Sequence, residues 1–424
     1  MSRFVIQGCR RLSGVYTPGG NKNAVLPMLA ACTLTDEILT LENVPLIADV
    51  SIMLEILEHL GVSVELKDHT VKLCAKGLRR SRLSPELCCR VRSSILFAGP
   101  LTARVGRATL SPPGGDVIGR RRLDTHFDGL RALGIDISGG RHYTFRRKAL
   151  KGADILLDEA SVTATENVLM AATLAQGRTT IMNAACEPHV QDLCRMLIAM
   201  GAQIGGIGTN CLQIDGVERL HGACHRIQPD HTEIGSFIAA AAVTGGELTI
   251  EGTAGADLRP VANTFRKLGV RWSAEGATLR LPARLKLRVS HDYGLAVPKI
   301  EDGTWPAFPS DLMSVAIVMA TQASGTVLFF EKMFESRMYF VDRLIDMGAR
   351  IVQCDPHRVL VTGPSRLHRQ HLASPDIRAG MALLVAALCA KGESVIDNAQ
   401  CIDRGYEQVD EKLRRLGAEI VREE

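Results

Sequence analysis

The residues with the clearest chemical potential lie in the segment SPPGGDVIGRRRLDTH, which covers positions 111–126. Its prolines and glycines disfavour both a strand and a helix interior, so we expect a loop. Asp116 lies in this loop, a few residues before the arginine run Arg120–Arg122. A carboxylic acid beside guanidinium groups suits proton transfer to an anionic substrate. The loop taken alone also fits a solvated surface turn, so its interpretation depends on the rest of the chain.

Further polar residues lie where six apolar, mostly alanine-rich stretches are expected to begin helices. These openings read PGGNKNAVLP, RSS, ASVTATEN, PDHTEIGS, FPSD and SPDIR. Helix N-termini carry unpaired N–H groups and partial positive charge, so several of them converging on one cleft would bind an anion. Five cations strengthen this expectation and indicate substrates with phosphate or carboxylate groups. They are Lys22, Arg92, Arg121, Arg378 and Arg404.

Helix capping is the alternative interpretation of these openings, because Ser, Thr and Asp are favoured before helices whatever the function. The residues that we expect to act as caps are Ser93, Thr232 and Ser310. Capping explains Lys22, Arg378 and Arg404 less well, since a cation at a helix start opposes the helix dipole unless an anion binds there. Asp311 fits an N-cap and a general base equally well, because local sequence does not show which hydroxyl it can reach.

A short phrase recurs six times at the ends of predicted surface helices, at intervals of about 70 residues. It places a glycine between a long apolar residue and an alternating stretch, as in LGVSV and LGIDI. We expect each glycine to end a helix in a left-handed C-cap that leads into a strand. The six glycines are Gly61, Gly134, Gly201, Gly269, Gly348 and Gly417.

The repeats predict the architecture. Each unit contains a buried helix, a surface helix and several strands, so six units in two groups of three would form two similar α/β domains with helices inside and sheets outside. A single row of six units is the alternative, although the terminal caps typical of a solenoid are not evident.

Composition limits the class of protein. A chain of 424 residues with 46% hydrophobic content predicts two or more domains with large cores. Aromatic content of 4% and a net charge of +4 disfavour a nucleic-acid partner. The twelve cysteines lack metal-ligand spacing, so we expect reduced thiols, no metal and no cofactor. No signal peptide or membrane span is evident, so we expect a cytoplasmic protein without a membrane partner.

Seven motifs together resemble the UDP-N-acetylglucosamine 1-carboxyvinyltransferase family (EC 2.5.1.7), the UDP-N-acetylglucosamine enolpyruvyl transferases. They are GGNKNAVLPMLAA, RSSILFAGPL, PPGGDVIGRRRLDTH, DGVERL, FPSDLMS, FESRM and IDRGYEQVDEKLRRLGA. They follow the family's order over almost the whole chain. The related enolpyruvyl transferase of the shikimate pathway shares the six-repeat fold but fits these phrases poorly.

The resemblance implies an α/β fold of two inside-out α/β barrels, each with three βαβαββ-type repeats, and an active site in the interdomain cleft. One domain would comprise residues 1–21 and 230–424. The other would comprise residues 22–229 and carry the Asp116 loop as a lid that excludes water. The oligomeric state stays open.

The implied reaction transfers the enolpyruvyl group of phosphoenolpyruvate to the 3-hydroxyl of UDP-N-acetylglucosamine and releases phosphate, the first committed step of peptidoglycan synthesis. It proceeds by addition and elimination through a tetrahedral ketal. Asp116 would give a proton to the methylene carbon, and Asp311 would take the proton of the sugar hydroxyl.

The resemblance also implies the binding residues. The phosphate and carboxylate would be held by Lys22, Arg121 and Arg404, supported by Arg337 and Arg378. The nucleotide-sugar site would be lined by Asn23, Arg92, Arg122, Leu123, Asp124, Thr125, Ser161, Val162, Thr163, Asp311 and Met333. Lys22 and Arg404 would also belong to the catalytic set.

Three positions depart from the family's usual residues. Asp116 replaces a cysteine, Arg122 follows Arg121 where proline is usual, and His231 stands where many members have arginine. The last two departures keep open carboxyvinyl transfer to a different nucleoside or sugar acceptor. A degenerate paralogue that only binds nucleotide sugar is the non-enzyme alternative. Retention of Lys22, an acid at position 116 and Arg404 argues for activity instead.

We predict intrinsic resistance to fosfomycin, an epoxide that alkylates the family's loop thiol, because an Asp116 carboxylate is not a thiolate nucleophile. Enzyme incubated with fosfomycin and then freed of it should keep its enolpyruvyl transfer activity. The Asp116→Cys variant should lose activity irreversibly under the same treatment. Irreversible inactivation of the unaltered protein at low concentration would contradict the prediction.

Overall fold

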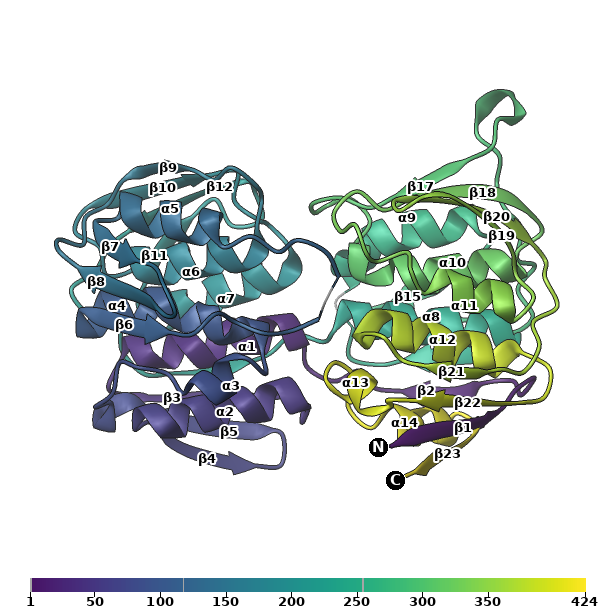
Figure 1. Cartoon of the computed structure of the whole chain (residues 1–424), viewed down its shortest axis with the longest axis horizontal. Helices are drawn as coiled ribbons and strands as arrows, with labels where there is room; N and C mark the ends of the chain where they lie inside the picture. Colours follow the sequence, from purple (N-terminus) through teal and green to yellow (C-terminus); the bar gives the residue numbers. More distant parts are fainter. Residues whose placement is uncertain (1, 117, 254) are drawn as a thin grey trace. The chain divides into compact units, whose positions relative to one another are not determined.

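The computed structural model describes residues 2–116, 118–253 and 255–424 (Figure 1). The described chain divides into two compact units. The terminal unit comprises residues 2–19, 118–120 and 229–424, and the central unit comprises Gly20–Asp116 and Arg121–Gln228. Within the described ranges, no helix has both the length and the apolar character needed to cross a lipid bilayer.

The central unit contains three small sheets. The first has the order β13 (Ala223–Arg226), β3 (Ile38–Glu42), β5 (Thr70–Cys74), β4 (Ser63–Lys67). The second has the order β6 (Arg107–Leu110), β8 (Tyr143–Arg147), β7 (Ile135–Ser138). The third has the order β11 (Gln203–Gly205), β12 (Cys211–Asp215), β10 (Arg178–Met182), β9 (Asp154–Leu156).

The helices of the central unit divide into inner and outer sets by burial. The inner helices are α1 (Lys22–Ala31), α4 (Ala98–Val105) and α6 (Val162–Ala172). The outer helices, each with an exposed face, are α2 (Ala48–Leu60), α5 (Asp124–Ala132) and α7 (Pro188–Ala199). The short helices are α3 (Pro85–Cys88) and the 3-10 helices η1 (Cys32–Leu34), η2 (Ala75–Gly77) and η3 (Arg92–Phe97).

The terminal unit also contains three sheets. The first has the order β21 (His371–Ala373), β22 (Glu393–Asp397), β1 (Arg3–Gln7), β23 (Glu419–Glu423). The second has the order β15 (Ser273–Glu275), β16 (Thr278–Leu281), β14 (Glu247–Ile250), β2 (Ser13–Tyr16). The third has the order β17 (Lys299–Glu301), β18 (Gly325–Phe330), β20 (Arg358–Gly363), β19 (Arg350–Asp355).

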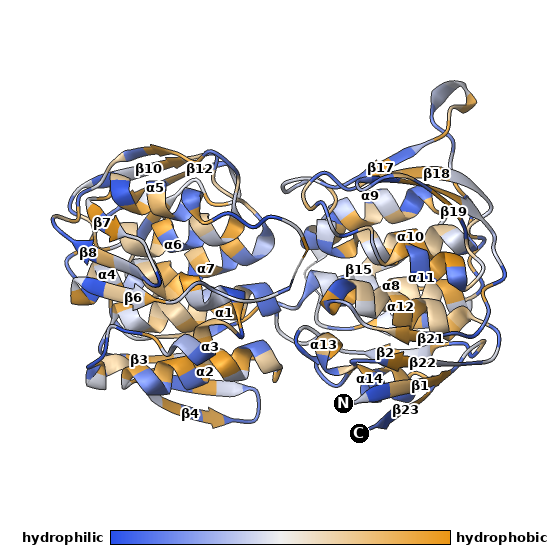
Figure 2. Cartoon of the chain, viewed as in Figure 1, coloured by the Kyte–Doolittle hydropathy of each residue, from blue (hydrophilic) through white to orange (hydrophobic). Residues whose placement is uncertain are grey.

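Three helices that pack on one another form the centre of the terminal unit: α8 (His231–Thr244), α10 (Met313–Gln322) and α12 (Ile377–Cys389). Figure 2 shows them as hydrophobic along most of their length. Their alanines let the backbones approach closely and leave no polar face, so burial stabilises them. The other helices are α9 (Arg259–Lys267), α11 (Val341–Asp346), α13 (Gln400–Asp403), α14 (Val409–Arg415), η4 (Gly255–Leu258), η5 (Tyr293–Leu295) and η6 (Ser310–Leu312).

The six repeat glycines end helices as the sequence predicts. All six have positive φ, from 85° at Gly269 to 100° at Gly348. At five of them the next residue donates its N–H to a carbonyl of the preceding helix, as from Val62 to Leu57 at 3.0 Å, and a strand follows. The α/β class and the six small sheets therefore agree with the predicted repeats. Local backbone chemistry is enough to mark each repeat, because these positions need a left-handed residue.

A parallel strand completes most sheets. β2, β9, β13, β17 and β21 each add in parallel to one strand of an otherwise antiparallel sheet. In the sheet of β6, β8 and β7, an isolated parallel bridge between Arg82 and Thr109 takes the place of that strand. The first strand of the chain, β1, lies between β22 and the last strand, β23, so both chain ends belong to one sheet (Figure 1).

Two of the inner helices begin differently from the sequence expectation. The stretches expected to be regular helices from Ser93 and Asp311 open as 3-10 helices, η3 and η6, before α4 and α10 begin. A 3-10 start tightens the first turn and turns its side chains relative to the helix that follows. Asp311 lies in one of these tight turns.

Gly99 sets the closest approach of α4 and α6. A Cβ at Gly99 would overlap the carbonyl oxygen of Asn167, whose side-chain oxygen also accepts the Gly99 N–H at 2.6 Å. We predict that Gly99→Ala lowers the free energy of unfolding by about 2 kcal/mol or more, measured by urea denaturation. The matched control Gly139→Ala, where the added methyl meets nothing within 4 Å, should change it by less than about 1 kcal/mol. Equal effects of the two substitutions would contradict this account of the helix contact.

Candidate active site

Asp311 is held between two arginines of the terminal unit. Arg337 Nη2 donates to its Oδ1 at 2.7 Å, and Arg378 Nη2 donates to its Oδ2 at 2.7 Å. Neither η6 nor α10 has a side-chain cap, so Asp311 is not the N-cap that the sequence left open. Burial raises the pKa of the Asp311 carboxyl, but the two guanidinium groups outweigh burial and hold that pKa far below its ordinary value. The carboxylate is therefore ionised and tightly held.

Arg337 and Arg378 also have hydrogen-bond donors that Asp311 does not use. Arg337 Nε and Nη1 and Arg378 Nη1 are buried and make no hydrogen bond within the described part of the chain. The side chains are 9% and 8% exposed. Aromatic rings support them, with Phe334 5.0 Å from the Arg337 guanidinium carbon and Tyr406 5.4 Å from that of Arg378. An anion that accepts these unused donors would complete the hydrogen bonding of both arginines.

His231 extends this group of residues. It is the first residue of α8 and is buried. Burial lowers the pKa of the imidazole and Arg378 lowers it further, while the charges of Asp230, Asp257 and Asp311 raise it, with a net lowering. The side chain is therefore neutral near pH 7. A neutral imidazole at this position leaves the positive charge to the two arginines.

Met333 and Arg404 occupy different settings in the terminal unit. Met333 is 39% exposed in the turn after β18, where its backbone N–H donates to Glu331. Arg404 is half-buried at the C-cap of α13. The expectation that Arg404 opens a helix is therefore wrong, because α12 ends at Cys389 and a separate short helix precedes Arg404. A cation at a helix C-terminus is favoured by the helix dipole.

Lys22 and Asn23 open the first inner helix of the central unit. Asn21 caps α1 and accepts the N–H of Asn23 at 2.8 Å. Lys22 is the first helical residue, and its ammonium lies 2.8 Å from the carboxylate of Asp49 in the first turn of α2. Both side chains of this ion pair are buried. Asp49 therefore offsets the cost of placing a cation at a helix start.

Arg92 hydrogen-bonds to the backbone of the arginine run in the loop. Its Nη2 donates to the carbonyl oxygens of Arg121 and Arg122 at 2.8 and 3.2 Å. Burial and, to a lesser extent, the charge of Arg121 together lower the pKa of Arg92 to about 10. Arg122 itself pairs with Asp124 at 2.9 Å and with Asp158 at 3.2 Å. The loop backbone is thus tied to η3, and its side chains are directed by neighbouring acids. Leu123 follows and immediately precedes α5.

The loop that carries Asp116 is fixed by contacts on either side of that residue. Asp116 is half-buried. Before it, the Gly114 N–H donates to Cys88 at 3.0 Å, and Gly114 packs too closely on Cys89 to carry a Cβ. After it, residues 118–120 belong to the terminal unit and bond within that unit, where Glu335 accepts the Arg120 N–H and the Ser336 N–H donates to the Ile118 carbonyl.

Ser161, Val162 and Thr163 form the start of α6. Ser161 caps the helix by accepting the Ala164 N–H at 3.4 Å. Thr163 Oγ1 lies 3.1 Å from His126 Nε2, and His126 Nδ1 lies 3.1 Å from the amide nitrogen of Asn167. Because that amide nitrogen is a donor, Nδ1 must accept, and the ring proton is on Nε2 facing Thr163. The hydroxyl proton of Thr163 is thereby left available for another acceptor.

The expected caps at Ser93, Thr232 and Ser310 are wrong. Ser93 Oγ is buried without a hydrogen-bond partner in the described ranges, and the Thr232 N–H donates to the true cap, Asp230. Ser310 donates to Glu331. At Thr232 the upstream Asp230 is the better acceptor, and at Ser310 the hydroxyl is taken up by a long-range contact with Glu331.

The structure adds residues that motif reasoning missed. They are Asp49, His126, Asp158, Asn167, Asp302 and Glu331. For the acids among them, the sequence signal was a position directly after or inside an apolar stretch, as in VLFFE, since such an acid requires a buried partner. Within the described residues no group of three or more His, Cys, Asp or Glu side chains has the arrangement of a metal site.

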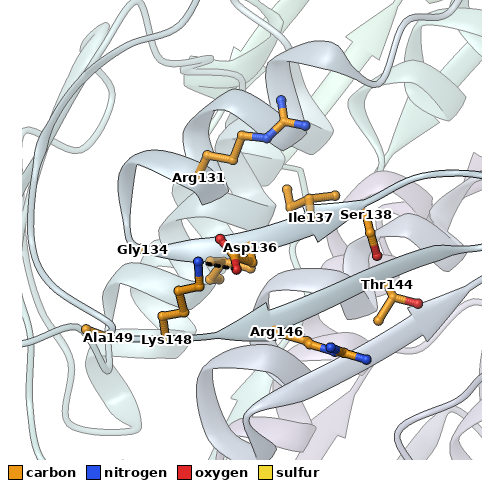
Figure 3. Close-up of a pocket in the computed structure, with 10 residues that line it drawn as sticks. Arg131, Gly134, Asp136, Ile137, Ser138, Thr144, Arg146, Lys148 and Ala149 are labelled. Atoms are coloured by element: carbon orange, nitrogen blue, oxygen red, sulfur yellow. Dashed lines mark ion pairs between the residues drawn. The ribbon is translucent and has the colours of Figure 1, made fainter.

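A hollow of about 420 Å³ on the central unit lies over the sheet of β6, β8 and β7 (Figure 3). Its charged side chains include Lys148 and Asp136, which pair with each other at 2.5 Å. None of the predicted site residues lines it. The hollow is therefore separate from the candidate active site.

A family model for EPSP synthase (3-phosphoshikimate 1-carboxyvinyltransferase) matches residues 6–413. Solved structures show the same fold. The enolpyruvyl transferase NikO from Streptomyces tendae has a TM-score of 0.89 at 24% identity, covering 99% of this chain and 98% of that one. EPSP synthase from Acinetobacter baumannii has a TM-score of 0.77 at 19% identity, with complete coverage of both chains. The chain belongs to the EPSP synthase family of enolpyruvyl transferases.

Relatives within this family carry a more specific name. UDP-N-acetylglucosamine 1-carboxyvinyltransferases from Treponema denticola and Bradyrhizobium diazoefficiens are each 53% identical over 421 residues, which is 99% of this chain and 99% and 98% of theirs. The enzyme of that name from Treponema pallidum is 53% identical over 424 residues, all of both chains. The resemblance seen in the sequence motifs is confirmed.

The neutral, buried His126 makes stability depend on pH. Burial lowers the pKa of His126 to about 3, below its unfolded value of about 6.5, so the unfolded chain binds a proton that the folded chain rejects. Stability from this group is thus lost as pH falls below about 6.5. Relative to His126→Gln, the wild type should lose about 2 kcal/mol more unfolding free energy between pH 7 and pH 5 in urea titrations. The exposed-site control His291→Gln should follow the wild type, and equal losses in His126→Gln and wild type would contradict the burial argument.

Proposed function

We propose that this chain is a UDP-N-acetylglucosamine 1-carboxyvinyltransferase. It transfers the enolpyruvyl group of phosphoenolpyruvate to the 3-hydroxyl of UDP-N-acetylglucosamine and releases phosphate, in peptidoglycan synthesis. The observation that carries the proposal is the pair of buried arginines around Asp311, which have unused donors suited to a phosphate or carboxylate. Full-length relatives at 53% identity bear this name.

Asp311 is the proposed base for the sugar hydroxyl, and the arginines control its basicity. While both guanidinium groups bind it, the carboxylate is too weak a base to take a hydroxyl proton. An anionic substrate competes for Arg337 and Arg378, and each donor that it takes from Asp311 raises the pKa of the carboxyl. Binding of phosphoenolpyruvate would therefore raise the basicity of Asp311 in the complex in which the acceptor hydroxyl must lose its proton.

Asp116 is the proposed proton donor to the methylene carbon of phosphoenolpyruvate. Lys22, Arg121 and Arg404 are the proposed ligands of its phosphate and carboxylate. Asp49 holds the Lys22 ammonium by its ion pair and thereby limits the positions that this cation can reach. The addition step protonates the methylene carbon and forms the ketal. Water would interfere with this step, so the loop must exclude water while Asp116 donates its proton.

The nucleotide sugar is the proposed ligand of Asn23, Arg92, Ser161, Met333 and the segment 122–125. Arg92 is suited to this role because it fixes the backbone at Arg121 and Arg122. Thr163 offers a hydroxyl proton directed by His126. Val162, between Ser161 and Thr163, would contribute apolar contact. These roles are assigned from the family resemblance, and for the residues of the central unit they are supported by the contacts within that unit.

The architecture that we propose follows the same resemblance. Each unit would be an inside-out α/β barrel of three βαβαββ-type repeats, with domains of residues 1–21 and 230–424 and of residues 22–229. One active site would take residues from both domains, and the Asp116 loop would be its lid. A cytoplasmic location is supported by the cysteines, since all twelve lie in described ranges and none is in a disulfide.

Phosphate release from phosphoenolpyruvate with UDP-N-acetylglucosamine as acceptor tests the function. We predict turnover by the wild type and a loss of about 100-fold or more in kcat for Asp311→Asn, which cannot accept the proton. The exposed-surface control Asp128→Asn should match the wild type. A folded wild type that binds phosphoenolpyruvate yet releases no phosphate with this acceptor would contradict the proposal and favour a different acceptor.

The same assay tests the loop residue. Asp116→Ala should lose turnover because the proton donor is gone, whereas Asp116→Cys should regain it, since a thiol is also an acid. Full activity of Asp116→Ala would show that Asp116 is not the donor.

A further inference from the structure

Two acidic residues meet at the ends of neighbouring parallel strands. In the β17–β18 pair Glu301 lies opposite Phe330, so the next residues on the two strands, Asp302 and Glu331, come side by side. Both are 0% exposed. Two carboxylates this close in a buried site cannot both be ionised, so the pair holds a shared proton.

Asp302 and Glu331 accept hydrogen bonds from two segments that carry site residues. Glu331 accepts the Ser310 hydroxyl at 2.9 and 3.0 Å through its two oxygens, and it accepts the N–H groups of Met333 and Phe334 at 3.3 and 3.2 Å. Asp302 accepts the Lys332 N–H at 2.6 Å. Ser310 immediately precedes Asp311, and the turn of residues 332–334 leads to Arg337. One buried pair therefore anchors both partners of an ion pair in the candidate active site.

The protonation of this pair follows from its surroundings. Burial and then Asp302 raise the pKa of Glu331, Arg337 and Ser310 lower it, and the net result is a pKa of about 9. His357 contacts only the backbone oxygen of Glu331, at 2.7 Å, and Lys332 directs its ammonium to Glu301 at 3.5 Å. Neither basic side chain pairs with either carboxylate, and Asp302 Oδ2 accepts no hydrogen bond from an N–H or hydroxyl donor among the described residues. A protonated Glu331 would have this oxygen as its acceptor, and near pH 7 its raised pKa keeps the proton on Glu331.

We propose that Asp302 and Glu331 are positioning residues of the enolpyruvyl transfer site, a hydrogen-bonded pair that fixes Asp311 and the turn of Met333 in their working geometry. This proposal rests on the proposed function, because it assigns the pair to the acceptor side of that reaction. Neither residue needs to touch a substrate. The pair acts through Ser310 on the base and through backbone N–H groups on the turn that carries Met333 and Arg337.

Kinetics of Glu331 variants test the proposal. Glu331→Gln keeps an oxygen for Ser310 and for the turn and supplies an N–H to Asp302, so its kcat and KM at pH 7 should stay within about 3-fold of wild type. Glu331→Ala releases both segments. It should raise the KM for UDP-N-acetylglucosamine by about 10-fold and lower kcat by about 100-fold, as expected for a displaced base.

The pH profile separates positioning from a merely structural role. Wild-type kcat/KM for the acceptor should fall above about pH 9, where Glu331 ionises beside Asp302 and the hydrogen bond between them is lost. Glu331→Gln should not show this fall, because its amide keeps its hydrogen at all these pH values. Asp302→Asn is the matched variant on the other strand, and its amide can donate to an ionised Glu331, so it should also remove the fall.

Each outcome decides the proposal. Wild-type kinetics in a folded Glu331→Ala variant would overturn it, and so would equal losses in the Ala and Gln variants. If Glu331→Ala fails to fold, the Gln variant decides, and a wild-type fall above pH 9 in that variant overturns the proposal. Absence of turnover in the wild type would instead refute the proposed function, so the two failures are distinct.

Discussion

The central interaction of this molecule is a carboxylate clamped by two desolvated guanidinium groups. Removing three charged groups from water is costly, and the Asp311 carboxylate accepts only one hydrogen bond from each of the two cations. Other guanidinium donors stay unused because the arginines are buried against aromatic rings. In the free protein, the two arginines that hold the proposed base therefore keep donors that can bind an anion.

The inner helices explain how such an arrangement is held in place. Their alanine-rich surfaces are buried against one another, and the proposed site residues lie at their N-terminal ends. Site residues cluster at those ends in every repeat. The openings are Lys22 at α1, Arg92 at η3, Ser161 at α6, His231 at α8, Asp311 before α10 and Arg378 at α12. A rigid helix start fixes both the backbone and the first rotamers, which loops do less well.

The repeats were predictable from sequence because a left-handed C-cap is a local event, and the glycine before each alternating strand carries it. Motif resemblance named the members of the candidate site, and the full-length relatives agree with its family. Side-chain partners were harder to predict. The hydroxyls of Ser93 and Ser310 were expected to cap helices, yet long-range packing gave them other surroundings. The pairing of Asp302 with Glu331 depends on strand register across the β17–β18 crossover, which no local pattern encodes.

The pairing of the two chain ends has a consequence for synthesis on the ribosome. Strand β1 lies between β22 and β23, so it emerges long before either of its partners has been made. The central unit, by contrast, takes almost all of its residues from one continuous stretch, so it can collapse while the terminal unit is still incomplete. Strand β1 must meanwhile stay unaggregated, and Arg3 within it, together with Arg10 and Arg11 after it, supplies charge that discourages pairing with other chains. The order of vectorial folding is therefore set by the topology of one small sheet.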